Sequence, residues 1–300
     1  MELVIDRDTN DRIDSYLSTE LDFSRSKVVK MIKNNEILVN DKPTKNSYVL
    51  KTGDSVTINE HEEDSMNVEP ENIPLNIVYE DDDVIVVNKA NGMVVHPAVG
   101  NTHGTLVNAL LYHAKTLSTI NGSFRPGIVH RIDAYTTGLL MVAKNDKAHE
   151  ILADELAKKE TTRKYVALVW GVINEDTATI DAPIGRDIKD RKKMAITAIN
   201  SKDAVTHLRV LKRYKDATLI ELKLETGRTH QIRVHMNYIG HPVVNDPVYG
   251  NRKLIDGSGQ CLHAMELGFR HPTTGKFMEF KSELPECFTN ILDRFEKGDY

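Results

Sequence analysis

The chain has 300 residues, of which 40% are hydrophobic and 28% charged, an ordinary balance for a globular protein of one or two domains. It contains no run of eighteen apolar residues and no signal-peptide pattern, so we expect a cytoplasmic protein without a membrane span. Two cysteines without CxxC spacing argue against a disulfide framework or a cysteine zinc site, and the formal net charge of -5 argues mildly against a simple nucleic-acid binder.

Residues 1–59 predict a small α/β module with a local basic character. A helix is expected to begin at Arg25 behind the N-cap Ser24, with strands at residues 37–39 and 56–58. From Asp22 to Lys51, seven Lys and Arg stand against three acidic residues, a local net charge of about +4. A solvated helix face would also explain this charge. The basic residues of the helix, which lie mostly off its apolar stripe, are Arg25, Lys27, Lys30 and Lys33.

Residues 60–71, EHEEDSMNVEPE, are acidic and poor in apolar side chains, so we interpret them as a linker. Residues 72–300 then form a second domain with few and unevenly placed helices. This favours an α+β fold around a mixed, largely antiparallel sheet. The expected strands are residues 84–88, 139–144, 164–170, 206–211 and 218–224, and the expected helix is residues 146–159.

A polar loop before the apolar run at residues 139–143 carries groups that could do chemistry. Asp133 lies close to Arg131, whose charge would keep the carboxylate ionised, as a nucleophile requires. A structural Asp–Arg pair that ties down the loop is the alternative. His130 is expected to hydrogen-bond within the loop.

Other chemistries find less support. A glycosidase needs a second carboxylate, which this loop lacks. The GxSxG, GxxxxGK[ST] and GxGxxG motifs are absent, and the histidines do not cluster with carboxylates at ligand spacing. The sequence thus shows no motif for a nucleotide cofactor or a metal ion.

Two further segments carry arginines. Arg228 follows Gly227 at the end of a strand, where its guanidinium could reach a pocket, and the helix that follows is expected to stop at Gly240. Arg233 and His235 on this helix could face RNA or solvent. Residues 185–193 hold five basic residues and predict either an RNA-facing loop or a solvated hairpin tip.

HRID followed by TTGLL resembles the HRLDxxTSGLL signature of the RluA/RluD-type pseudouridine synthases, most closely the RluD type. Segments at residues 79–97, 104–113, 163–171 and 227–235 follow the pattern of that family in order, although Ala90 stands where a proline is more usual. At the N-terminus, RxDxYL, SRSxVxKxI, IxVN and GDxVxI resemble the alpha-L, S4-type RNA-binding domain.

The resemblance implies an enzyme that isomerises a flipped-out uridine without a cofactor. By family analogy its substrate is large-subunit ribosomal RNA. It implies Asp133 as the catalytic aspartate, Tyr165 as the residue that stacks on uracil and removes the last proton, and Arg228 as the partner of Asp133. Arg131 would contact phosphate or fill the gap left by the base. The basic helix would contribute RNA contacts from Arg25, Lys27, Lys30 and Lys33. We expect a monomer.

Two other classes remain open at this point. A ribosome-assembly factor with vestigial catalysis is disfavoured by the intact set of Asp133, Tyr165 and Arg228. An RNA glycosidase, or another base-modifying enzyme, is disfavoured by the lack of a second carboxylate. The identity of the modified uridines, and whether the aspartate attacks the base or the sugar, stay undecided.

Overall fold

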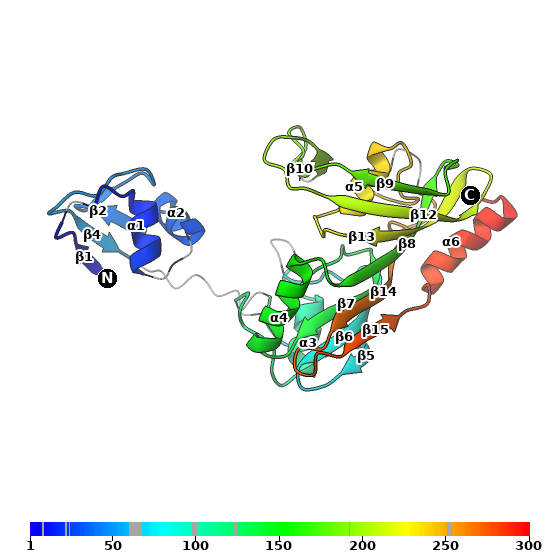
Figure 1. The fold of residues 1–300 in the computed structure, drawn as a ribbon, viewed down its shortest axis with the longest axis horizontal. Coiled ribbons are helices and arrows are strands. Elements are labelled where there is room, and N and C mark those ends of the chain that lie inside the picture. The colour runs from blue at the N-terminus through cyan, green and yellow to red at the C-terminus, as the bar shows by residue number, and fades with distance from the viewer. Residues whose placement is uncertain are drawn as a thin grey trace. The chain divides into compact units, whose positions relative to one another are not determined.

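The computed structural model describes residues 1–7, 9–21, 23, 25–59, 68–97, 101–122, 125–191, 193–250, 252 and 254–300. The chain divides into two compact units, Met1–Asn67 and Val68–Tyr300, and each unit has a hydrophobic core of its own (Figure 1). Within the described part of the chain, no helix combines the length and apolar character that crossing a membrane requires.

The smaller unit packs two helices on a four-stranded antiparallel sheet of order β1-β4-β2-β3. Its elements are β1 (Glu2–Val4), α1 (Ile13–Glu20), α2 (Arg25–Lys33), β2 (Ile37–Val39), β3 (Lys42–Pro43) and β4 (Ser55–Ile58). The helix expected from Arg25 and the strands expected at residues 37–39 and 56–58 are confirmed, whereas α1 was not predicted. The proposed N-cap, Ser24, lies outside the described residues.

The apolar stripe of α2 explains its position. Val28 and Ile32 are buried in the core of this unit, together with Leu17 of α1. Arg25 and Lys33 are exposed, in agreement with their places off the stripe. The side chains of Lys27 and Lys30 are not among those described.

The larger unit is built on a nine-stranded sheet (Figure 1) of order β5-β6-β7-β14-β8-β13-β12-β9, with β15 paired to β14. Every pairing in it is antiparallel except that of β7 with β14, so the expected α+β fold with a mixed, largely antiparallel sheet is confirmed. The strands are β5 (Asn76–Glu80), β6 (Val84–Lys89), β7 (Thr137–Ala143), β8 (Thr162–Trp170), β9 (Thr177–Asp181), β12 (Val205–Arg213), β13 (Ala217–Leu224), β14 (Leu262–Arg270) and β15 (Phe277–Lys281).

Helices and a small hairpin complete the larger unit. Its helices are α3 (Leu106–His113), α4 (Asp146–Ala157), α5 (Gln231–Tyr238) and α6 (Glu286–Lys297), and the hairpin pairs β10 (Ile184–Arg186) with β11 (Met194–Ile196). The predicted helix at residues 146–159 is confirmed as α4, which begins after the N-cap Asn145 because its side chain accepts a hydrogen bond from the amide of Ala148. Helix α5 ends before Gly240, as its sequence indicated.

The predicted acidic linker is described only from residue 68 onward. Asn108 in α3 donates its side-chain amide to the carbonyl of Glu69 at 2.8 Å, and the amide of Gly104 lies 3.2 Å from the carboxylate of Glu71. Residues 68–71 therefore belong to the larger unit, and its boundary lies before the expected residue 72. The reason is that these residues find polar partners around the start of α3, which composition alone does not reveal.

The parallel pairing of β7 with β14 fixes the segment that precedes β7. Gly138 faces Ala264 in the register of this pair, and a Cβ at Gly138 would lie only 2.2 Å from the Ala264 carbonyl oxygen. Its φ of +106° is also a conformation that residues with side chains rarely adopt. Glycine thus lets β7 enter the centre of the sheet directly behind residues 127–136, which we call the Asp133 loop.

Candidate active site

A cavity of about 400 Å³ opens beside the Asp133 loop, and we call it the Asp133 pocket. Three segments distant in the sequence supply most of its lining: the Asp133 loop, the start of β8, and residues 227–233, which lead into α5. The lining includes Ile132, Asp133, Tyr165, Leu224, Arg228 and Arg233. The pocket therefore joins a carboxylate, an aromatic ring and several arginines, and its size is that of a small-molecule or single-nucleotide site.

Asp133 is held by an arginine from α5. Arg233 donates from Nη1 to Oδ2 of Asp133 at 2.9 Å, and from Nε and Nη2 to both carboxylate oxygens of Asp246 at 2.7 and 2.8 Å. The side chain of Arg233 is 4% exposed and that of Asp133 17%. Burial disfavours the guanidinium charge, but the bonds and charges of both aspartates outweigh it and raise the Arg233 pKa. Asp133 thus meets a permanently charged, oriented donor.

The expected partners of Asp133 were wrong. Arg228 donates from Nε to the carbonyl of Asp203 at 2.9 Å, because it precedes α5 in a loop that runs beside residue 203. Arg131 is exposed and forms no hydrogen bond or ion pair with the described residues. The sequence interpretation missed Arg233, which it assigned to RNA or solvent, and also missed Asp246. Both arginines, Arg131 and Arg228, nevertheless line the Asp133 pocket.

The Asp133 loop is fixed on two sides. On one side, the buried Lys89 donates from Nζ to the carbonyls of Ala134, Ala90 and Met93, each at 2.8 Å. Burial lowers the pKa of Lys89 to about 7, against the opposing charge of Asp133. On the other side, Gln260 donates to the hydroxyl of Thr136 at 3.1 Å. The backbone that carries Asp133 is therefore anchored within one residue of the carboxylate.

A histidine also approaches Asp133. His230 precedes α5 in a left-handed backbone conformation with φ 57°, and its Nε2 lies 3.8 Å from Oδ1 of Asp133. Its Nδ1 lies 2.8 Å from the hydroxyl of Tyr249, which in turn accepts a bond from the amide of Met194. Burial lowers the His230 pKa more than the Asp133 charge raises it, so the ring is neutral at pH 7.

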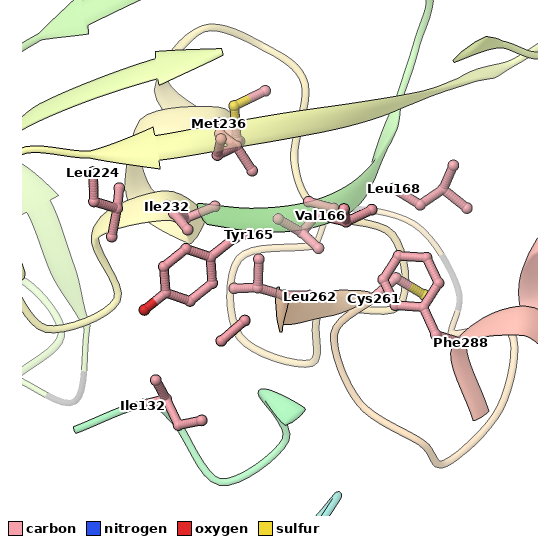
Figure 2. Close-up of a cluster of buried hydrophobic side chains, with 14 of the residues drawn as sticks. Ile132, Tyr165, Val166, Leu168, Leu224, Ile232, Met236, Cys261, Leu262 and Phe288 are labelled. Atoms are coloured by element: carbon pink, nitrogen blue, oxygen red, sulfur yellow. The ribbon is translucent and has the colours of Figure 1, made fainter. Parts of the chain in front are cut away.

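Tyr165 supplies the aromatic surface of the pocket. It lies in β8 and is 7% exposed. Figure 2 shows its ring among the aliphatic side chains of Ile132, Leu224, Ile232 and Leu262. Burial is the main cause that raises the Tyr165 pKa; the Arg163 charge opposes it and the Asp133 charge adds to it, so the hydroxyl is protonated at neutral pH.

Two other histidines have structural partners. His130 accepts from the amide of Met141 in β7 at 3.1 Å, so it hydrogen-bonds to the strand after the loop. His235 is buried and contacts the hydroxyl of Thr206 and the carbonyl of Ala182, which corrects the expectation that it faces RNA or solvent. Among the described residues, no group of three or more His, Cys, Asp or Glu could hold a metal ion.

The basic segment at residues 185–193 forms most of the hairpin between β10 and β11, with residue 192 outside the described residues. In the smaller unit, Arg25 is 58% exposed while its guanidinium pairs with the buried Asp14 at 3.1 Å. Arg25 is thus positioned by an ion pair within its own unit.

Comparison with known families decides the identity of this arrangement. Residues 83–238 match the family model for RNA pseudouridylate synthase, and residues 11–56 match the S4 domain. The chain belongs to the RNA pseudouridylate synthase family. It is accordingly an RNA-modifying isomerase with an S4 domain, and the family resemblance of its motifs is confirmed.

Relatives match over almost the whole length. An uncharacterized RNA pseudouridine synthase of Bacillus subtilis is 54% identical over 96% of this chain and 95% of its own length. The ribosomal large subunit pseudouridine synthase D of Haemophilus influenzae is 42% identical over 93% of this chain and 89% of its own. A solved structure, human RNA pseudouridylate synthase domain containing 1, has a TM-score of 0.58 and 27% identity, covering 79% of this chain and 98% of the human one.

Proposed function

We propose that the protein isomerises specific uridines in large-subunit ribosomal RNA and that Asp133 is its nucleophile. One observation carries the assignment of the nucleophile: the Asp133 carboxylate lies in a pocket of about 400 Å³ and receives a hydrogen bond from the buried Arg233. The substrate class rests on the relatives named as large-subunit ribosomal synthases in Haemophilus influenzae and Neisseria meningitidis, the latter 42% identical over 96% of this chain.

We propose the following course for the isomerisation. A uridine turned out of the RNA enters the Asp133 pocket, and the Asp133 carboxylate assists cleavage of the bond between N1 of uracil and C1′ of ribose. The uracil rotates, its C5 bonds to C1′, the proton leaves C5 and N1 ends protonated. Atoms and charge balance within the nucleotide, so no co-reactant is consumed.

Arg233 provides the electrostatic part of this proposal. Its charge and its Nη1 donor bind and orient the Asp133 carboxylate, which is the proposed reactive group. Because Asp246 binds the other edge of the same guanidinium, the direction of the bond to Asp133 is set before substrate arrives. We propose that Arg233 has the role that the family resemblance implied for Arg228, which is to pair with Asp133.

Tyr165 is proposed to stack on the uracil and to accept the C5 proton at the last step. Tyr165 lines the Asp133 pocket, and an aromatic ring among aliphatic side chains suits contact with a flat base. Since the hydroxyl carries its proton in the absence of substrate, stacking is its resting role, and proton transfer requires prior loss of that proton.

RNA binding outside the pocket is proposed to come from the S4 domain and the pocket rim. Arg131 is exposed next to Asp133, where it can contact a phosphate or fill the space of the flipped base. In the smaller unit, the basic residues proposed for phosphate contacts are Arg25, Lys27, Lys30 and Lys33.

Chemical mapping of pseudouridines tests this function. Ribosomal RNA from cells with and without the gene is labelled and compared, and the gene is restored as parent or as Asp133→Asn. We expect one or a few large-subunit positions to lose pseudouridine without the gene and to regain it only with the parent. Unchanged large-subunit RNA, with loss at a transfer RNA position instead, would contradict the proposed substrate while leaving the enzyme class in place.

A further inference from the structure

Arg163 is a buried arginine without a counter-ion. It lies in β8, two residues before Tyr165, and is 7% exposed. Its Nε is buried and has no hydrogen-bond partner among the described residues, and none of their carboxylates lies within 4 Å of its guanidinium. Buried arginines are ordinarily paired with an anion. Arg163 also lines the Asp133 pocket, so the missing partner can come from a molecule that enters it.

Arg228 approaches the same pocket from the loop before α5. Its Nε donates to the carbonyl of Asp203, which holds one side of the guanidinium. No carboxylate of the described residues pairs with the Arg228 guanidinium. The charge of Arg228 acts on Arg163: burial is the main cause that lowers the Arg163 pKa, the nearby Tyr165 opposes it, and the charge of Arg228 adds to the lowering. The two guanidinium groups thus repel each other across a shared space.

Gly227, which directly precedes Arg228, leaves room for the Arg163 guanidinium. A Cβ added at Gly227 would lie 2.7 Å from Nη1 of Arg163, whereas its φ is not in the left-handed region. A side chain at this position would therefore displace the Arg163 guanidinium, whereas the backbone conformation itself does not call for glycine. Because Gly227 directly precedes Arg228 in the sequence, the space beside Gly227 adjoins Arg228.

The charge of the pocket is unbalanced. Arg233 is compensated by Asp133 and Asp246, but Arg163 and Arg228 have no acidic partner in the described part of the chain. In a partly closed cavity of about 400 Å³, such charges are screened less than on an open surface. An anion bound between them would relieve the repulsion and satisfy the free donors.

We propose that Arg163 and Arg228 form an anion subsite of the Asp133 pocket that binds the phosphate group adjoining the flipped uridine. The inference rests on the proposed function, because it takes the uridine as occupant of the remainder of the pocket. Phosphate fits better than a uracil carbonyl, since it carries a full charge and several oxygens that match two planar forks. The subsite would anchor the nucleotide backbone while the released uracil turns beside Tyr165.

Calorimetric titration of the full chain with uridine, uridine 5′-monophosphate and uridine 3′-monophosphate tests the subsite. We expect one of the two monophosphates to bind at least about tenfold more tightly than uridine, which also identifies the side on which the phosphate lies. This gain in affinity over uridine should fall below about twofold in Arg163→Met and in Arg228→Met. Arg209→Met is the control, because Arg209 lies exposed on β12 and pairs with Glu221.

A further variant guards against misfolding of Arg163→Met. Gly227→Ala keeps both arginines but crowds the Arg163 guanidinium, so it should reduce the gain while the melting temperature stays near that of the parent. An equal gain in all folded variants, or no gain in the parent, overturns the subsite. These results are separable from the proposed function. If ribosomal RNA loses pseudouridine without the gene but neither monophosphate binds more tightly than uridine, only the subsite is contradicted. If a monophosphate binds more tightly but no pseudouridine is lost, only the proposed function is contradicted.

Discussion

Arg233 and Asp246 form a two-bond pair, in which both carboxylate oxygens accept from one edge of the guanidinium. Asp246 is fully buried on its side chain and also accepts from the amides of Val248 and Tyr249. Burial raises the Asp246 pKa, but the bonds and charge of Arg233 outweigh it and lower that pKa below its ordinary value. The ionised Asp246 fixes the plane of the guanidinium and leaves Nη1 directed at Asp133.

Arg233→Lys should therefore lose rate while keeping the charge. A lysine cannot bind both oxygens of Asp246 and also reach Asp133, so we expect the single-turnover rate to fall about ten- to a hundredfold, where each 1.4 kcal/mol is a factor of ten. Rate measured at saturating enzyme on ribosomal RNA lacking the modification checks this. Arg209→Lys is the matched control. A rate within twofold of the parent would show that charge alone suffices.

Asp133→Asn should abolish isomerisation and leave RNA affinity within about threefold. The amide preserves the shape of the side chain but supplies no nucleophilic carboxylate. Single-turnover assays and filter binding on the same RNA measure both quantities. Asp176→Asn, at an aspartate 86% exposed and paired with Arg213, is the control. Pseudouridine formation at a substantial fraction of the parent rate would remove Asp133 from its proposed role.

Tyr165→Phe separates stacking from proton transfer. The ring and its aliphatic neighbours remain, so RNA affinity should persist, while loss of the hydroxyl should remove most of the turnover. Tyr165→Ala should lose both affinity and rate, because the stacking surface is gone. Full activity of the Phe variant would refute the base role, and equal losses in Phe and Ala would assign Tyr165 a structural role only.

Deleting the smaller unit should weaken RNA binding without unfolding the remainder. The core of that unit, which includes Leu17 and Val28, is separate from the core around β7 and β8. A chain of residues 68–300 should keep a cooperative melting transition, bind RNA more weakly and show a shallower dependence of affinity on salt. An insoluble product, or unchanged RNA affinity, would contradict the independence of the two units.

Asp81→Asn should destabilise the larger unit in a pH-dependent way. Burial alone would raise the Asp81 pKa, but hydrogen bonds from Tyr79, the amides of Val84 and Asp83, and His271 lower it to about 2. A carboxylate with a lowered folded pKa stabilises above its unfolded pKa of about 4 and loses that contribution as pH falls through about 2.

We expect a loss of about 1–2 kcal/mol at pH 7, discounted for the 28% exposure of the Asp81 side chain. Urea unfolding of parent and variant between pH 7 and pH 2 measures it. The difference should narrow below about pH 4, and Asp176→Asn should show little difference at any pH. A constant difference across this range would assign the effect to packing.

Local patterns predicted much of the fold. The strand predicted at residues 139–144 begins with a continuous apolar run at residues 139–143, and β7 is buried along its whole length. In contrast, β14 was missed because its sequence, LHAMELGFR, mixes apolar residues with His263 and Glu266, which are nonetheless buried. Glu266 can lie there because Lys164 of β8 pairs with it at 2.6 Å, and that partner is known only from the folded sheet.

The candidate site, like the fold, could be predicted from the sequence only in part. Asp133 could be identified within one loop, since its motif is contiguous. Its partner could not, because Arg233 is 100 residues away and Asp246 follows a further 13 residues on. Whether Arg228 or Arg233 reaches the carboxylate depends on how α5 packs against the sheet. Two arginines five residues apart in one motif look equivalent until that packing is known.

Gly138 has a consequence for how variants of this enzyme are interpreted. Any side chain there would press on the Ala264 carbonyl and force β7 away from β14. The displaced strand would carry the Asp133 loop with it, although Asp133 and Arg233 would remain chemically intact. In a mutational scan scored by activity, position 138 should therefore be as intolerant as position 133, while a purified Gly138→Ala protein would reveal a geometric defect and not a missing functional group.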